Sequence, residues 1–208
     1  MSKPIRILLP LVGFVVFALA GTALAADPRY PDWPCAQAKV PEVSVAAVWA
    51  GPALDDATGK WKDDAETSAL VARLSARRTP IEDAEAQISK YLASKPANKS
   101  EAGKELFAGV FETLNEQRSS VMSGLERTMR KQRAAAEKIR EDTATLHGLQ
   151  DAASPDQTKI NALADQLGWQ TRIFEDRSKV VRFVCDVPNA IDQRLFALSR
   201  AIQQGMED

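Results

Sequence analysis

The stretch FAGVFETLNEQRSSVMSGLERTMRKQRAAAEKIREDTATLHGL, residues 107–149, decides the fold of this 208-residue chain. One stripe of residues recurs in it at alternating steps of four and three, and its members are Phe107, Phe111, Leu114, Arg118, Val121, Leu125, Thr128, Gln132, Ala135, Ile139, Asp142, Leu146 and Leu149. Such spacing keeps one mostly apolar face on an α-helix over many turns. The stretch therefore predicts a long helix that packs on a partner helix as a coiled coil.

The partner helix is expected directly after this stretch. Residues 154–157, SPDQ, carry helix-start signals: Ser154 as N-cap, Pro155 at the first helical position and Gln157 in a capping box. The same spacing of apolar residues then continues from Ile160 to Ile202. Because the connection is short, the two helices are predicted to run antiparallel as a hairpin.

The two stripes have matched lengths, as an antiparallel hairpin requires. When Leu149 faces Ile160 near the turn, Leu106 faces Ile202 at the other end. About fifty residues in each helix would make a rod roughly 75 Å long.

Pro188 interrupts the second stripe without changing its phase. Proline removes a backbone hydrogen bond inside a helix and collides with the preceding turn. Two interpretations stay open: a kinked helix that continues, which we favour, or a break with Asp186 capping a new helix.

Two shorter helices are predicted before the hairpin. The first is expected over residues 60–78, and the second starts with Thr79 as N-cap and Pro80 at its first position. Each has about fifteen to nineteen residues, so together they can cover only part of the rod. We expect them to pack at its base, the end farthest from the hairpin turn.

Residues 26–59 show no helical period and are rich in proline, with Pro28, Pro31, Pro34, Pro41 and Pro52. Proline favours extended, polyproline-like backbone. This segment is therefore expected to form a strap across the helices. The predicted fold is all-α: a long antiparallel coiled-coil hairpin, two shorter helices packed at its base, and a proline-rich N-terminal strap.

The neck of the hairpin, around residues 180–187, carries more apolar surface than a two-helix seam can bury. The strap is the expected cover, with Tyr30 and Trp33 packing against Phe183 and Val184. The alternative cover is a second copy of the chain, which would make a homodimer. Both arrangements could hold together.

The first 25 residues follow the plan of a secretory signal peptide. Lys3 and Arg6 precede an apolar run from Ile7 to Ala20, and small residues at positions 23 and 25 favour cleavage before Ala26. The run of about fourteen residues is shorter than the roughly twenty that span a bilayer. We expect a periplasmic or secreted protein, divided into signal peptide 1–25, strap 26–59 and one helical domain 60–208, with no membrane span after cleavage.

Export would place the two cysteines, Cys35 and Cys185, in an oxidising compartment, where one disulfide is the simplest outcome. On the chain-entropy model, closing so long a loop stabilises a fold by roughly 5 kcal/mol. The alternatives are a bridge between chains and a redox-active pair. The second is disfavoured because the Cys-x-x-Cys spacing is absent.

The sequence contains no motif for catalysis, a metal or a cofactor. His147 is the only histidine, so neither a di-iron bundle nor an ordinary zinc site can be assembled. The acidic run 55–66 departs from the order of an EF-hand, because Ala57 and Lys60 occupy positions that need an acid and a glycine. We therefore expect no enzyme activity and no cofactor.

Basic residues mark the candidate partner surface on the hairpin. Residues 127–140 hold six basic side chains against Glu137 alone, and the opposite span 169–182 adds a smaller excess. The candidates are Arg127, Arg130, Lys131, Arg133, Arg172 and Lys179. A cluster of one sign can dock an acidic protein or an anionic surface, and the alternative is a solvated face with ion pairs inside each helix. Nucleic acid is not expected as a ligand after export.

These features favour an exported, non-catalytic scaffold or adaptor that presents a coiled-coil hairpin to an unknown envelope protein. In gross shape the hairpin resembles the periplasmic adaptors of efflux and secretion machines, although those embed it between β-domains that this chain lacks. The alternative is a holdase-type chaperone, similar to the jellyfish-shaped periplasmic chaperones but without their β-rich body. An envelope stress or metal sensor is a third hypothesis, disfavoured by the single histidine.

Overall fold

The computed structural model describes residues 27–54 and 57–207, and this part of the chain is all-helical, without β-strands. The predicted signal peptide lies outside the described residues. In chain order the elements are α1 (Val45–Val48), a short 3-10 helix η1 (Lys60–Lys62), α2 (Ala65–Ser75), α3 (Ile81–Ala93), α4 (Lys99–Gln150), α5 (Gln157–Val184) and α6 (Asp186–Glu207). The all-α prediction is confirmed.

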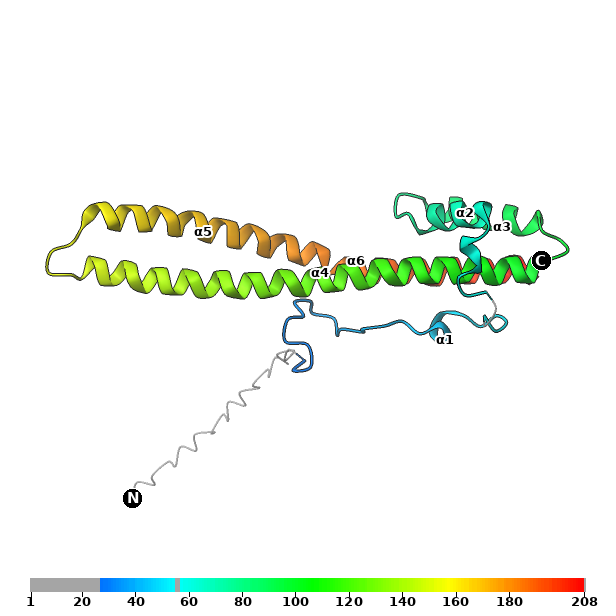
Figure 1. Ribbon diagram of the computed structural model, residues 1–208, viewed down its shortest axis with the longest axis horizontal. Coiled ribbons are helices and arrows are strands. Elements are labelled where there is room, and N and C mark those ends of the chain that lie inside the picture. The colour runs from blue at the N-terminus through cyan, green and yellow to red at the C-terminus, as the bar shows by residue number, and fades with distance from the viewer. Residues whose placement is uncertain (1–26, 55–56, 208) are drawn as a thin grey trace, which may run out of the picture.

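Helix α4 forms the long axis of the molecule, and α5 and α6 return beside it one after the other (Figure 1). Arg118 Nε donates to a carboxylate oxygen of Asp192 at 2.8 Å, and Gln132 Nε2 donates to Ser178 Oγ at 3.0 Å. Both pairs lie one position from the antiparallel register predicted from the two stripes. The chain reverses direction through residues 151–156.

The start of α5 differs from the prediction. Asp156, not Ser154, is the N-cap residue, and its carboxylate accepts a hydrogen bond from the backbone amide of Lys159 at 3.1 Å. Gln157 is the first helical residue and donates to Asn161 instead of closing a capping box. A carboxylate is a charged acceptor and complements the positive end of the helix dipole, which a serine hydroxyl does less strongly.

The starts of the two shorter helices also differ. Asp64 caps α2 through hydrogen bonds from the next turn, so the predicted helix 60–78 is shortened to α2 with η1 before it. Pro80, not Thr79, is the N-cap residue of α3. The Thr79 hydroxyl donates to the Arg73 carbonyl at 2.8 Å, and it therefore closes the end of α2.

The outcome at Pro188 lies between the two predictions. Helix α5 ends at Val184 and α6 begins at Asp186, so the helix is divided, but Cys185 keeps right-handed helical dihedrals and its amide donates to the Val181 carbonyl. Asp186 is the first residue of α6 and not its cap. Pro188 is then the third residue of α6. The first amides of a helix have no acceptor within it, so the missing N–H of this proline costs no helical hydrogen bond.

Helices α2 and α3 pack on α4 and α6 at the end of the molecule farthest from the 151–156 turn, as predicted (Figure 1). The core there includes the fully buried side chains of Leu74, Ile88, Leu92, Leu106, Phe107, Leu114, Leu195, Leu198 and Ile202. We call this four-helix part the base. Gly109 lets α2 approach α4 closely, because a Cβ at this position would lie 2.6 Å from Val71 Cγ2.

Within the described ranges, no helix combines the length and apolar character needed to cross a membrane.

Candidate interaction surface

Beyond the base, α5 and the second half of α4 project as a two-helix extension that we call the arm (Figure 1). Only Ile160 and Val181 are buried among the 28 residues of α5. This helix packs along α4 and meets α6 mainly at their junction. Most of the surface of α5 is therefore open to solvent.

The seam of the arm contains a polar layer at Asp142. This carboxylate is buried and accepts hydrogen bonds from Lys138 at 2.8 Å and from Gln166 and Gln170 at 3.2 Å each. The hydrogen bond from Lys138 is the main reason that the pKa of Asp142 lies below its ordinary value. Buried polar residues of this kind can fix the register of a helix pair at some cost in stability.

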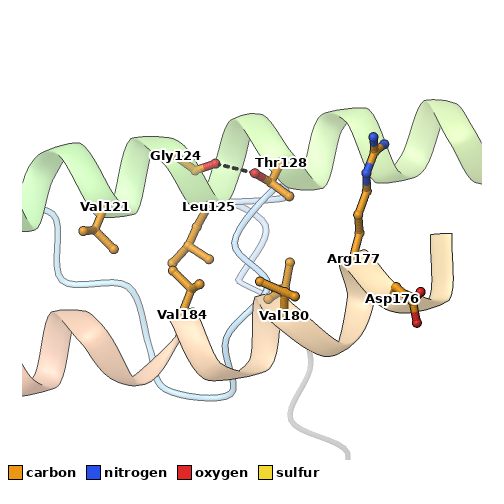
Figure 2. A pocket seen from close by; sticks show the side chains of 9 residues that line it. Val121, Gly124, Leu125, Thr128, Asp176, Arg177, Val180 and Val184 are labelled. Atoms are coloured by element: carbon orange, nitrogen blue, oxygen red, sulfur yellow. Dashed lines mark hydrogen bonds between the residues drawn. The ribbon is translucent and has the colours of Figure 1, made fainter. Parts of the chain in front are cut away.

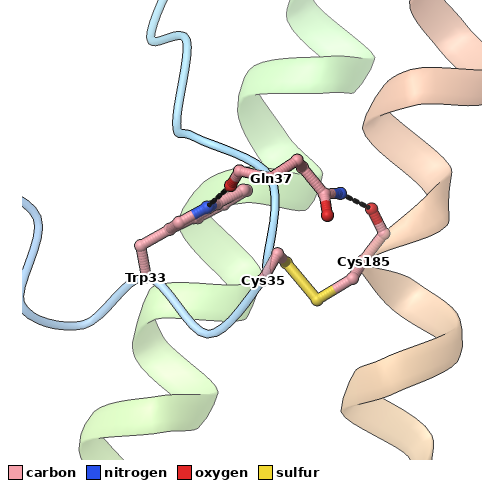
Figure 3. Close-up of a disulfide and its surroundings, with 4 residues drawn as sticks. All are labelled: Trp33, Cys35, Gln37 and Cys185. Atoms are coloured by element: carbon pink, nitrogen blue, oxygen red, sulfur yellow. Dashed lines mark hydrogen bonds between the residues drawn. A yellow bond between two sulfur atoms is a disulfide. The ribbon is translucent and has the colours of Figure 1, made fainter. Parts of the chain in front are cut away.

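At the neck, a disulfide joins Cys35 to Cys185, as the sequence predicted, with the two Cα atoms 5.5 Å apart (Figure 3). It fixes the N-terminal segment, residues 27–54, against the α5–α6 junction. Gln37 Nε2 donates to the Cys185 carbonyl at 2.5 Å, and Trp33 Nε1 donates to the Gln37 carbonyl at 2.7 Å (Figure 3). These bonds satisfy one carbonyl of the N-terminal segment and the Cys185 carbonyl at the end of α5.

The N-terminal segment contacts α4 as well. Lys39 forms an ion pair with Glu126 at 2.6 Å and lies 4.5 Å from the centre of the Tyr30 ring. The buried Arg118 donates to the Pro41 carbonyl at 3.3 Å. The segment is thus bound to α4 as well as to the α5–α6 junction.

The four residues predicted to pack at the neck have different positions. Trp33 and Val184 belong to one apolar cluster around Leu125, whereas Tyr30 packs against Lys39 outside this cluster. The prediction that Phe183 is covered is wrong, because its side chain is 76% exposed. Val181 and Cys185 face α4 and the segment, and Phe183 is two positions from each, about 200° around the helix.

Phe183→Ala is therefore expected to change the free energy of unfolding by less than about 0.5 kcal/mol, as surface substitutions usually do. Trp33→Ala should lower it by roughly 2–3 kcal/mol, because it removes half-buried apolar area and the hydrogen bond to Gln37. Urea unfolding of the two variants beside the wild-type protein measures both values. Equal losses for the two variants would contradict this assignment of the neck.

The structure does not bring the six candidate basic residues into one surface. Arg130 and Arg133 form ion pairs with Asp32 of the N-terminal segment, at 3.1 Å and 2.8 Å. Arg127 lies two positions, or about 200°, from the buried Leu125, so it points away from α5. Lys131 is four positions further along and shares this outer side of α4.

The two candidates on α5 are separate from those on α4. Arg172 lies over the Trp169 ring at 5.4 Å from its centre, and Lys179 pairs with Asp176 at 3.0 Å. The candidate partner surface on the hairpin stays a prediction. Asp32 neutralises part of its charge, although the Arg130 and Arg133 side chains remain more than half exposed, and the other four cations are divided between the two helices.

A feature that sequence reasoning missed is an apolar groove between α4 and α5 with a volume of about 480 Å³ (Figure 2). Its lining residues are Val121, Gly124, Leu125 and Thr128 of α4 and Asp176, Arg177, Val180, Val181 and Val184 of α5. Beside it, α5 exposes the large side chains of Trp169, Ile173 and Val180.

The groove and the N-terminal segment lie on opposite sides of the arm. On α4, Glu126, Arg130 and Arg133 bind the segment, whereas Gly124 and Thr128 line the groove. Helical phase places these two sets on opposite flanks of Leu125. The segment therefore leaves the groove open.

No family model, curated protein or solved structure matches this chain. Within residues 27–54 and 57–207, no group of three or more His, Cys, Asp or Glu side chains is placed to hold a metal ion. The arm, the neck and the groove are the structural features from which a function can be inferred.

Proposed function

We propose that this protein is an exported, non-catalytic scaffold or adaptor. In this proposal the arm is an antiparallel coiled-coil hairpin that binds another envelope protein, and residues 26–59 form a strap that braces it. The observation that carries the proposal is the exposed arm: α5 has 28 residues, of which two are buried. The base already has a closed core of its own.

The energetics of the arm support this proposal. Burial of apolar area is the main force that stabilises a fold, and α5 contributes little of it. The arm nevertheless contains several devices that define its shape: the polar layer at Asp142, the disulfide at the neck and the ion pairs of Asp32. A long, exposed and well-braced pair of helices is suited to presenting a surface to a partner.

The outer side of α4 is the face that we assign to the envelope partner. Arg127 and Lys131 are exposed there, one helical turn apart. Two like charges at this spacing destabilise a helix slightly, by about 0.2–0.5 kcal/mol, so folding does not require them, but they attract acidic surfaces over about a Debye length. We therefore expect an acidic partner and an interaction that weakens as salt rises.

The apolar groove favours a second candidate, the holdase-type chaperone. A chaperone of this kind would hold exposed apolar segments of unfolded proteins, and a groove lined by valine and leucine side chains can receive them. The two functions differ in partner range. An adaptor should retain one acidic protein, whereas a holdase should retain many unfolded ones.

Affinity capture from envelope extract, at low and high ionic strength, tests this proposal. Arg127→Gln with Lys131→Gln should abolish salt-sensitive capture of the partner without changing stability. The matched control is Arg78→Gln with Lys90→Gln, which removes the same charge from exposed residues of the base. If both double variants retain the same proteins as wild type at both salts, the outer side of α4 is not a docking face.

A variant with a shortened arm provides the second test. Deleting residues 136–149 and 160–173 removes two heptads from each helix, opposite one another in the register, and shortens the arm by roughly 21 Å. Circular dichroism and an intact Cys35–Cys185 disulfide would show that the base and neck still fold. This variant keeps Arg127 and Lys131, so it should still capture the acidic partner in a salt-sensitive way. Loss of capture with an intact base and neck would contradict the assignment of the partner to these two residues, and capture of many unfolded proteins by wild type would support the holdase.

A further inference from the structure

A stripe of apolar residues on α5 has no cover in this chain. Trp169, Ile173 and Val180 are 64%, 43% and 59% exposed, and Val184 is half-buried. At 100° per residue these four side chains fall within about 60° of one another around the helix. They therefore share one face of α5, with Asp176 and Arg177 at its centre, and Val180 and Val184 of this face also line the groove (Figure 2).

The stripe is symmetric about the midpoint between Asp176 and Arg177. Trp169 and Val184 lie equally far from this point, and so do Ile173 and Val180. When two identical helices pack antiparallel about a two-fold axis at this midpoint, each residue faces the residue of the other copy that lies equally far on the other side of the midpoint. Every such contact therefore occurs twice. The axis would place Trp169 against the partner's Val184, Ile173 against the partner's Val180, and Asp176 against the partner's Arg177.

We propose that two copies of this chain pair through α5, antiparallel about a two-fold axis at Asp176 and Arg177, with each Trp169 indole seated in the other copy's groove. Val184 lines that groove together with Val121 and Leu125 of α4. Tryptophan supplies a large apolar area for burial, about 150–250 Å². The two copies thus fill the two grooves reciprocally.

Charge selects the antiparallel arrangement. In a parallel two-fold pair each residue would meet its own copy, so that Asp176 would face an aspartate and Arg177 an arginine. Like charges in contact cost several kcal/mol at an interface, whereas the antiparallel pairing makes two oppositely charged pairs. Asp176 already pairs with Lys179 of its own helix, but both side chains are about two-thirds exposed, and the carboxylate can accept from a second cation.

The position of the N-terminal segment is compatible with this pairing, because it lies on the other side of the arm. Arg127 and Lys131 lie on the same flank of α4 as the groove residue Gly124, so a second copy seated in the groove would pass beside them. The inference goes beyond the proposed adaptor function because it assigns the groove side to a second copy of the chain, and the purified chain tests it without any envelope partner.

Sedimentation equilibrium of the purified full chain tests the pairing, over roughly 5–500 µM because small interfaces hold weak complexes. Wild type should dimerise. Asp176→Arg and Arg177→Asp should each raise the dimer Kd at least about tenfold, since each puts like charges in contact twice. The doubly reversed variant should recover wild-type affinity, and an equimolar mixture of the two single variants should form a heterodimer. Glu141→Arg, on an exposed site of α4, is the control that should leave the Kd unchanged.

Cysteine crosslinking tests the register. Ile173→Cys combined with Val180→Cys should give a disulfide-linked dimer under mild oxidation. Within one chain the two positions are about 10.5 Å apart along the helix, beyond the roughly 7 Å that a disulfide can bridge. The single-cysteine variants should stay unlinked.

Three results would overturn the pairing: a wild-type monomer over the whole concentration range, self-linking of either single-cysteine variant, or failure of the doubly reversed variant to recover affinity. If a photo-crosslinker at position 169 captures a different protein in the native envelope while the purified chain is a monomer, the face belongs to that protein. All substituted side chains are exposed in the single copy or lie at its rim, so the variants should fold.

Discussion

Replacing both Cys35 and Cys185 with serine is expected to lower the free energy of unfolding by roughly 3–5 kcal/mol. The disulfide joins residues 150 positions apart, and the entropy that a crosslink removes from the unfolded chain grows with loop length. The loop contains every helix of the described residues except α6. This loss should exceed that of any single substitution in the arm.

Urea unfolding of the double-serine variant, beside oxidised wild type, measures this effect. Wild type first needs mass spectrometry without reduction, to confirm the single intramolecular bridge. Limited proteolysis at Lys39 gives a local readout, because its side chain is 14% exposed and release of the N-terminal segment should expose it before the base unfolds. A loss below about 1 kcal/mol, with this site still protected, would mean that contacts such as Lys39 with Glu126 hold the segment without the bridge.

The long helices were predictable because their signal is local and repeated. A stripe such as that containing Leu125 and Gln132 fixes one face of a helix over many turns, and the antiparallel register follows from two stripes of equal length. The structure differs from that register by one position at Arg118 and Gln132. The packing of the two shorter helices at the base was also predictable, because they are too short to cover the whole rod.

Helix ends were harder to predict because neighbouring residues compete for the same role. Ser154 and Asp156 can both cap a helix, and Thr79 can either start α3 or close α2. In the structure Asp156 caps α5, and Thr79 closes the end of α2. Differences of about 1 kcal/mol decide such choices, and the sequence alone does not show which carbonyl lies within reach.

The neck shows the limit of counting apolar residues without their phase. Phe183 adds hydrophobicity to residues 180–187, yet it projects away from both Leu125 and the N-terminal segment. Because helical phase was not considered, the stripe of Trp169, Ile173 and Val180 was not predicted either; it lies beside the main seam of α5. A phase plot of α5 would have found this stripe.

Apart from the Cys35–Cys185 bridge and the packing of Trp33 at the neck, the contacts of the N-terminal segment had no signal in the sequence. An extended segment has no period that marks which side chains face the protein, so the pairing of Asp32 with Arg130 and Arg133 depends on tertiary structure alone. The consequence for function is direct. Two of the six cations that we predicted to bind a partner form ion pairs inside the chain, which is why the proposed function assigns the partner to Arg127 and Lys131.

The segment is anchored at a second place, in the base, and this anchor gives the last prediction. Phe107→Ala should lower the free energy of unfolding by roughly 3–5 kcal/mol, as large-to-small changes in a core do. Phe107 is fully buried, and its ring stacks on that of Trp49 with centres 4.1 Å apart. Trp49→Ala should cost a similar amount, since Trp49 is buried and also donates to the Pro52 carbonyl at 2.8 Å.

Because the two rings contact each other, the double variant should lose less than the sum of the single losses, by about 0.5–1.5 kcal/mol. Phe196→Ala is the matched control: this phenyl ring on α6 is half exposed, and its removal should cost under about 0.5 kcal/mol. Unfolding in urea gives all four values. Strictly additive losses would show that Trp49 does not dock on Phe107 in solution. Other contacts, such as those of the Val48 carbonyl with Ser199 and of the Ala50 amide with Gln203, would then hold the segment on the base.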